Sequence, residues 1–213
     1  SIVSYTGTGS NATVGHGLGA VPAWYFIKQR NTTGGSIVYH KGNTSSPETD
    51  YLRLDKTDST VDDAIFNDTA PTSSVFSIGT AQAVNKSSGT YVAYCFAEKP
   101  GYSKFGSYTG NGNTDGTFVY TGFTPAFVMT KRSDSTSDWL ICDNKRPGYN
   151  VINKKLFPNS SSGEDSYDSF DFVSNGFKIR SSGTGHNASG GTFIYMAFGQ
   201  SLVGSNNVPC TAR

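Results

Sequence analysis

Apolar residues in this chain fall in short runs that are separated by Gly, Ser, Thr and Asn. Runs rich in aromatic and β-branched residues predict strands, as at 24–28 and 127–131. The two most apolar runs, 91–97 and 193–198, are expected to be central strands. No segment repeats its apolar residues with the 3.6-residue period of a helix, so the pattern predicts an all-β protein whose helical content is minimal, with a turn near 61–67.

One hairpin is readable from its turn residues. Asn175 and Gly176 lie between the apolar pairs Phe172-Val173 and Phe177 with Ile179. Asn-Gly between two apolar runs favours a two-residue type I′ turn, since both residues tolerate the positive φ angles that this turn needs.

The chain contains an internal repeat. The sequence SYTGTG at 4–9 returns as SYTGNG at 107–112, and PAW at 22–24 returns as PAF at 125–127, both at an offset of 103. GTYV at 89–92 returns as GTFI with the offset reduced to 102. We therefore expect a gene duplication and divide the chain into copy one (1–104), copy two (105–200) and a C-terminal extension (201–213).

A unit of about 100 residues is the size of a small β-sandwich or of half a large one. Residues 101–106 run directly into copy two without a Pro- or Ser-rich hinge. The expected fold is therefore an antiparallel β-sandwich with a pseudo-twofold internal repeat. The alternative is two tightly packed small sandwiches.

Composition excludes several classes of protein. The 213 residues are 15% charged and 13% aromatic, which is unlike a disordered chain. A net charge of +1 argues against a nucleic-acid-binding surface, and no apolar run is long enough for membrane insertion. The three cysteines form no CxxC pair, so neither a zinc ribbon nor a disulfide framework is indicated, and Cys95 and Cys142 lie in apolar runs as small buried residues would.

Motifs for catalysis, metals and cofactors are absent from the sequence. There is no HExxH motif, no His-x-His pair, no Gly-x-Ser-x-Gly elbow and no phosphate loop. His16 and His186 lie among Gly and Ser, as exposed loop residues do, and His40 ends an apolar run. We expect no enzymatic activity, no cofactor and no metal site.

One cluster in copy two suits a ligand. Aromatic rings beside acidic and basic groups are typical of sugar binding, since the ring covers the apolar face and the polar groups bond to hydroxyls. The candidate ligand-binding residues are Trp139, Asp143, Lys145, Arg146 and Tyr149, with Asn144 between them. The alternative interpretation is a core Trp at the start of a strand, followed by a charged loop.

Several longer strings resemble one family of proteins. They are GLGAVPAW at 17–24, YVAYCFAE at 91–98, GYSKFGSYTGNG at 101–112, FDFVSNGFK at 170–178, FIYMAF at 193–198 and VPCTAR at 208–213. Together they resemble a repeated module in virion proteins of tailed phages from aquatic bacteria, notably marine and cyanobacterial ones. The resemblance implies a lectin-like or laminin-G-like sandwich with a structural role, and it implies no catalytic residues.

The expected function is that of a non-enzymatic virion structural or attachment protein. The resemblance leaves its place open among tail fibre, head fibre and capsid decoration. The implied partners are other virion proteins, further copies of the chain in a homo-oligomer (a trimer is favoured) and a host surface polysaccharide. The implied location is the virion, assembled in the cytoplasm of the host bacterium. A stand-alone carbohydrate-binding module and a polysaccharide depolymerase are the alternatives.

The extension 201–213 has no counterpart at the end of copy one. It is polar and short, so we expect either disorder or contact with a neighbouring subunit. In the second case the assembly contacts would be Val208, Pro209, Cys210 and Arg213.

Overall fold

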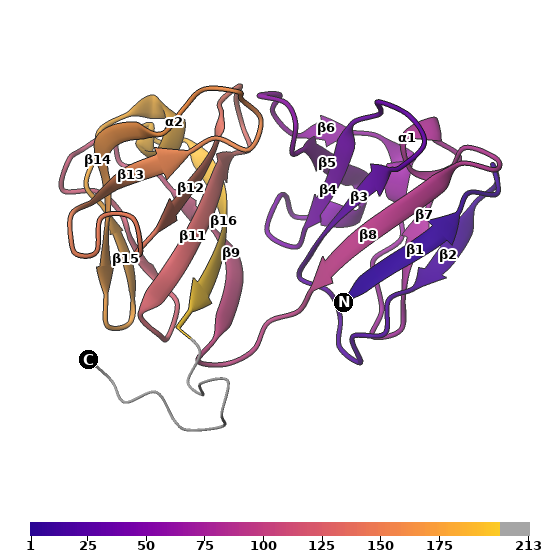
Figure 1. Ribbon diagram of the computed structural model, residues 1–213, viewed down its shortest axis with the longest axis horizontal. Coiled ribbons are helices and arrows are strands. Elements are labelled where there is room, and N and C mark those ends of the chain that lie inside the picture. Colours follow the sequence, from indigo (N-terminus) through magenta and orange to yellow (C-terminus); the bar gives the residue numbers. More distant parts are fainter. Residues whose placement is uncertain (201–213) are drawn as a thin grey trace.

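The structure is a computed structural model that describes residues 1–200, apart from the side chain of Asp168. It is 43% strand and 7% helix, and every strand pairing is antiparallel. Figure 1 shows two lobes side by side, one from the N-terminal half and one from the C-terminal half. The predicted all-β, antiparallel, sandwich-like class is therefore confirmed.

The first lobe is built on a six-stranded sheet. In spatial order its strands are β1 (Ile2–Thr6), β8 (Thr90–Phe96), β3 (Trp24–Gln29), β4 (Ser36–His40), β5 (Asp50–Arg53) and β6 (Val61–Asp62). A ribbon of β2 (Ala12–Gly15) and β7 (Val75–Ile78) packs on this sheet, with Phe76 stacked on Tyr25. Its helices are the 3-10 turns η1 (Pro47–Thr49) and η2 (Ala64–Phe66) and the single-turn helix α1 (Gln82–Asn85).

The second lobe is built on an eight-stranded sheet. The order is β10 (Phe118–Tyr120), β15 (Gly176–Ile179), β14 (Asp165–Val173), β13 (Ile152–Leu156), β12 (Trp139–Asp143), β11 (Pro125–Arg132), β16 (Thr192–Gly199) and β9 (Ser103–Thr109). The two edge strands of this sheet, β10 and β9, approach each other. The hydroxyl of Thr117, beside β10, donates a hydrogen bond to the main-chain oxygen of Thr109, at the end of β9, at 2.7 Å. The sheet is therefore curled almost into a barrel, with helix α2 (Thr184–Asn187) beside it.

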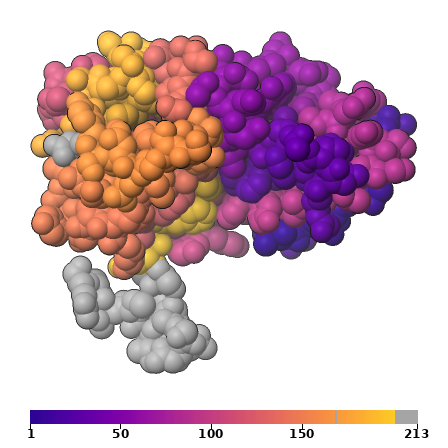
Figure 2. Space-filling view, turned by 45° about the horizontal axis from the view of Figure 1, so that its top comes forward, coloured from indigo at the N-terminus to yellow at the C-terminus, as the bar shows by residue number. Residues whose placement is uncertain are grey.

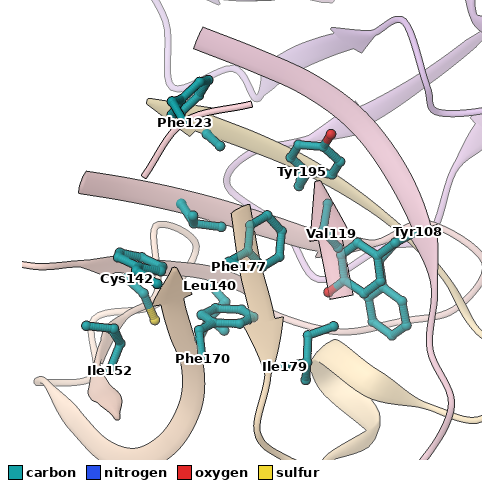
Figure 3. Packing of buried hydrophobic residues seen from close by; sticks show 14 of the residues in the cluster. Tyr108, Val119, Phe123, Leu140, Cys142, Ile152, Phe170, Phe177, Ile179 and Tyr195 are labelled. Atoms are coloured by element: carbon teal, nitrogen blue, oxygen red, sulfur yellow. The ribbon is translucent and has the colours of Figure 1, made fainter. Parts of the chain in front are cut away.

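Each lobe encloses its own apolar core. Figure 3 shows the core of the second lobe, where Phe170, Phe177 and Cys142 lie inside the curled sheet. Cys95 and Cys142 are both buried, as their apolar surroundings in the sequence predict. A third apolar cluster lies between the lobes and contains Ala23, Trp24, Val38, Leu52, Phe105, Met129, Trp139, Ile194 and Met196.

Strand alternation explains why the central runs look almost uniformly apolar. In β16, Phe193 and Tyr195 belong to the second lobe's own core, whereas Ile194 and Met196 belong to the cluster between the lobes. Successive side chains of a strand point to opposite faces of the sheet, and here both faces are buried. Both runs predicted to be central are interior strands, β8 and β16.

Polar contacts also join the lobes. The indole Nε1 of Trp139 donates to the main-chain oxygen of Arg53 at 2.8 Å, and the ammonium group of buried Lys131 donates to that of Thr57 at 3.2 Å. Figure 2 shows the lobes meeting without a gap on the face that it presents. Among the described residues no strand of one half pairs with a strand of the other, so the arrangement is the alternative of two tightly packed units.

The strand orders of the two sheets correspond. The succession β1-β8-β3-β4-β5 in the first sheet has the counterpart β9-β16-β11-β12-β13 in the second. Tyr5 stacks on Tyr91 with ring centroids 5.0 Å apart, and Tyr108 stacks on Phe193 at the same distance. These matched contacts agree with a duplicated unit, and the duplication itself stays a prediction. Strand β9 begins at Ser103, slightly before the start expected for copy two.

The hairpin around Asn175 forms, but its predicted turn is wrong. Val173 pairs with Gly176, so the turn residues are Ser174 and Asn175, and neither adopts a positive φ angle. Gly176 instead lies within β15, where a Cβ atom would be 2.1 Å from the main-chain oxygen of Val119. Close approach of β10, and not turn geometry, therefore requires glycine here.

Candidate functional site

Trp139 does not belong to an exposed ligand site. Its side chain is 1% exposed and packs in the cluster between the lobes. Its main-chain N–H donates to Asn159 Oδ1 at 2.8 Å, which fixes the start of β12. The prediction that this ring stacks on a ligand is wrong for this structure, and the alternative of a core Trp at a strand start is the one observed.

Asp143 organises the loop that follows β12. Its Oδ1 accepts the main-chain N–H groups of Lys145 and Arg146 at 2.8 and 3.0 Å, and its Oδ2 accepts Arg146 Nε at 2.6 Å. Partial burial acts to raise the pKa of Asp143, but these hydrogen bonds outweigh it and the pKa is lowered. The carboxylate is therefore ionised and already occupied within the loop.

Arg146 links this loop to a distant segment. Its Nη1 lies 3.2 Å from Glu164 Oε2, and Glu164 Oε1 lies 3.3 Å from the ammonium group of Lys154. Nothing in the sequence signals that Glu164, eighteen residues away, joins the cluster. The charges balance one another, so the network orders the loop and leaves little unpaired charge for a ligand.

Lys145 and Tyr149 are the predicted residues that face solvent. Tyr149 is 81% exposed, and Lys145 is exposed as well. In the described part of the chain neither side chain makes a hydrogen bond or an ion pair with another residue. The loop therefore presents one cation and one aromatic ring to a partner, on a base held by Asp143 and Arg146.

The rings of His16 and His40 bond to main-chain groups. The expectation that His16 and His186 are exposed is wrong, because they are 0% and 7% exposed. His16 Nδ1 accepts from Leu18 N at 3.2 Å and its Nε2 lies 3.0 Å from Thr72 O, so the ring ties a loop together.

His40 holds the two lobes together. Its Nδ1 accepts from the main-chain N–H of Gly42 at 3.0 Å, so the proton is on Nε2, which donates to the main-chain oxygen of Tyr195 at 3.0 Å. Burial lowers the pKa of His40 to about 4 and that of His186 to about 4. Both rings are neutral at pH 7.

The described residues outside this loop and the histidines offer few other groups that could form a site. Glu98 pairs with Lys41 at 2.8 Å and with Lys104 at 3.7 Å on the surface. Within 1–200 no group of three His, Cys, Asp or Glu side chains is placed to hold a metal ion, and no helix there is long and apolar enough to cross a membrane. The predicted assembly residues Val208, Pro209, Cys210 and Arg213 lie outside the described residues.

Comparison with known proteins gives a family. A family described as a domain of unknown function (DUF7483) matches residues 1–201. No curated protein and no solved structure matches the chain. Because the family match spans almost the whole sequence, the chain belongs to the DUF7483 family.

Proposed function

We propose that this protein is a non-enzymatic structural or attachment module of a bacteriophage particle, at a fibre tip or as a capsid decoration, with host surface polysaccharide as its ligand. The resemblance of its repeated strings to phage virion modules is the reason for naming a phage. The virion is accordingly its proposed location, and other virion proteins are its proposed partners.

The observation that best supports the proposal is the way in which the lobes are joined. Trp139 and His40 each donate a hydrogen bond across the boundary, within or beside an apolar cluster that is closed to solvent. An interface of this kind resembles the interior of a domain and resists relative motion of the lobes. A rigid body with polar loops outside suits a part that must present a surface while it stays attached to a particle.

Self-association is part of the proposal, with a trimer favoured because fibres are commonly trimeric. Light scattering after size-exclusion chromatography tests it. The expected mass is about three times the 22.7 kDa of one chain. A single-chain mass for the complete protein would contradict the trimer.

The experiment that tests virion membership is mass spectrometry of particles purified on a density gradient. Peptides of this chain should co-purify with capsid and tail proteins in constant proportion across the particle peak. Absence of the chain from particles would overturn the proposal. Release of reducing ends from host polysaccharide by the purified chain would instead favour the depolymerase.

A further inference from the structure

Each lobe has a cleft between its short helix and two paired strands, which are β4 and β5 in the first lobe and β12 and β13 in the second. In the first lobe the cleft has a volume of about 420 Å³, and its walls include Gly35, Ile37, Tyr51, Arg53 and Ala83. In the second lobe the cleft has a volume of about 200 Å³, and its walls include Asp138, Leu140, Lys155, Phe157, Gly185 and His186. None of these residues belongs to the loop at 143–149.

The two clefts occupy the same place in the two sheets. Strand pairing aligns Val38 with Leu52 in the first lobe and Ile141 with Leu156 in the second. Val38 and Ile141 are matched by the 103-residue offset of the repeat. Leu52 therefore corresponds to Leu156. The residues that follow them, Arg53 and Phe157, correspond to each other, and so do the residues that precede them, Tyr51 and Lys155.

Further wall residues match in the same way. The 103-residue offset aligns Gly35 with Asp138 and Ile37 with Leu140, and the 102-residue offset aligns Ala83 with Gly185. The five matched positions line both clefts, so the correspondence does not depend on a single residue.

Both clefts keep a cation beside an aromatic ring, although the two residue types have exchanged positions. Arg53 Cζ lies 5.8 Å from the ring centroid of Tyr51, and Lys155 Nζ lies 6.0 Å from that of Phe157. The same ammonium group also lies 4.9 Å from the ring centroid of Tyr167. The two lobes differ in sequence at these positions, yet each places a cation over an aromatic ring in its cleft. We take this as a sign that the cation–aromatic pair has a role beyond packing.

Carboxylates complete each cleft. Asp55 lines the first cleft with Oδ1 occupied by the main-chain N–H of Ser36, which leaves Oδ2 available. Asp138 lines the second cleft, and its Oδ1 accepts from Asn159 Nδ2. Each cation also lies near a carboxylate outside the wall, since Arg53 Nη1 is 3.8 Å from Asp58 Oδ2 and Lys155 Nζ is 3.3 Å from Asp165 Oδ2. Each cleft thus combines a cation, a carboxylate and an apolar wall, with little net charge.

The second cleft also contains a buried polar group without a partner. His186 is 7% exposed and is one of the residues that form the wall of this cleft, and its Nε2 is closed to solvent and makes no hydrogen bond within the described residues. A buried polar atom in this state costs free energy unless a ligand or water satisfies it.

We propose that the two clefts are equivalent binding sites, each of which takes one neutral sugar unit of a polysaccharide. This inference rests on the proposed attachment function and deepens it. A sugar unit needs donors and acceptors for its hydroxyls and an apolar wall for its C–H groups, and the balanced charge favours a neutral sugar over an acidic one. The second cleft, at about 200 Å³, is smaller than the roughly 300–1,000 Å³ of a pocket for a drug-sized ligand, which suits a single sugar ring, and the first cleft, at about 420 Å³, also has room for one.

Amide NMR of the whole chain tests the proposal without any substitution. The probes are the methyl glycosides of glucose, galactose, mannose and N-acetylglucosamine, with glucuronic acid for comparison, each at millimolar concentration. At least one neutral glycoside should shift amides in two groups, at 33–37 with 51–56 and at 137–140 with 155–157. Shifts confined to 143–149, binding of glucuronic acid alone, or no shift with any probe would overturn the proposal.

Two substitutions test the sites separately. Lys155→Met should weaken binding at the second cleft by about tenfold or more and leave the first unchanged, since a hydrogen bond to a charged group is lost. Arg53→Met should give the reverse. The matched controls are Lys178→Met, on β15, and Arg180→Met, directly after it, which also remove a cation paired with a carboxylate but lie outside both clefts.

The outcomes separate this proposal from the proposed function. If the chain is found on particles and no glycoside shifts the cleft amides, the cleft proposal fails and the virion proposal stands. If a glycoside binds both clefts and the chain is absent from particles, the cleft proposal stands and the virion proposal fails.

Discussion

Asn85 and Asn187 make the same contacts in the two lobes. Each side-chain amide is fully buried at the end of a short helix and bonds to the loop after the first strand of its lobe. Asn85 accepts from Thr8 N at 2.7 Å and donates to Ser10 O and Gly79 O at 2.6 and 2.8 Å. Asn187 accepts from Asn111 N at 3.0 Å and donates to Asn113 O and Ser181 O, both at 2.7 Å. Each amide therefore fixes the helix that borders a cleft.

Replacing either amide should destabilise the protein. Asn187→Ala and Asn85→Ala should each lower the free energy of unfolding by about 2–4 kcal/mol, because main-chain groups that are bonded to the amide lose their partner. Urea unfolding followed by circular dichroism measures this. The control Asn175→Ala, at an exposed turn, should change the free energy of unfolding by less than about 0.5 kcal/mol. Equal effects at Asn187 and Asn175 would contradict the assigned role.

The sequence predicts the strands well because burial on both faces leaves a strong signal. Runs such as 91–97 and 193–198 are apolar throughout, and both become interior strands. It does not predict α1 and α2, since one turn of helix, QAVN or TGHN, carries no periodicity and is held by a buried Asn.

The candidate site is less predictable than the fold. Trp139 beside a charged loop has the local sequence of a ligand site, but strand alternation turns its ring into the boundary between the lobes. Whether a given face of a strand packs against the other lobe depends on contacts between residues that are far apart in the sequence, such as Trp139 and Arg53. The local sequence does not predict such contacts. The same reason hides Glu164 as a partner of Arg146.

Trp139 should be a stability residue. Trp139→Ala removes a large buried ring and the hydrogen bond to Arg53 O, so we expect a loss of about 3–5 kcal/mol in the free energy of unfolding. Tyr149→Ala, at a ring that is 81% exposed, is the control and should leave stability unchanged. An unchanged denaturation midpoint for Trp139→Ala would show that the ring does not hold the lobes together.

Position 176 should require glycine, because the main chain of β10 leaves no room for a side chain there. Gly176→Ala would place a Cβ 2.1 Å from Val119 O, so β10 must shift, and we expect a loss of about 1–3 kcal/mol. Gly163→Ala meets nothing within 4 Å and its φ is not positive, so it should be neutral or slightly stabilising. Thermal unfolding of the pair decides the matter, and equal midpoints would exclude the steric account.

Stability should fall as the pH drops from about 6.5 towards 4. The pKa values of His40 and His186 are about 4 in the folded chain, below the 6.5 of an unperturbed histidine. In that window the unfolded chain binds protons that the folded chain does not, so each ring costs up to about 3 kcal/mol of stability. Near His40, Lys41 lowers the pKa and Glu98 opposes it.

Substitution isolates this effect. His40→Gln and His186→Gln cannot titrate, so the double variant should lose less stability than the natural chain between pH 6.5 and 5. That window lies above the range where aspartates with lowered pKa, such as Asp115 and Asp134, become protonated. Urea midpoints measured across the window provide the test. Identical slopes for both proteins would rule out the histidines as the cause.

We propose that this chain is an exposed part of a phage particle, and electron microscopy of intact particles labelled with gold-conjugated antibody against residues 1–200 is the test. We predict label at one fixed place, either at fibre tips or over the capsid surface, and label competed away by the purified chain. Particles that carry no label, while the same antibody detects the chain in the lysate, would contradict the claim.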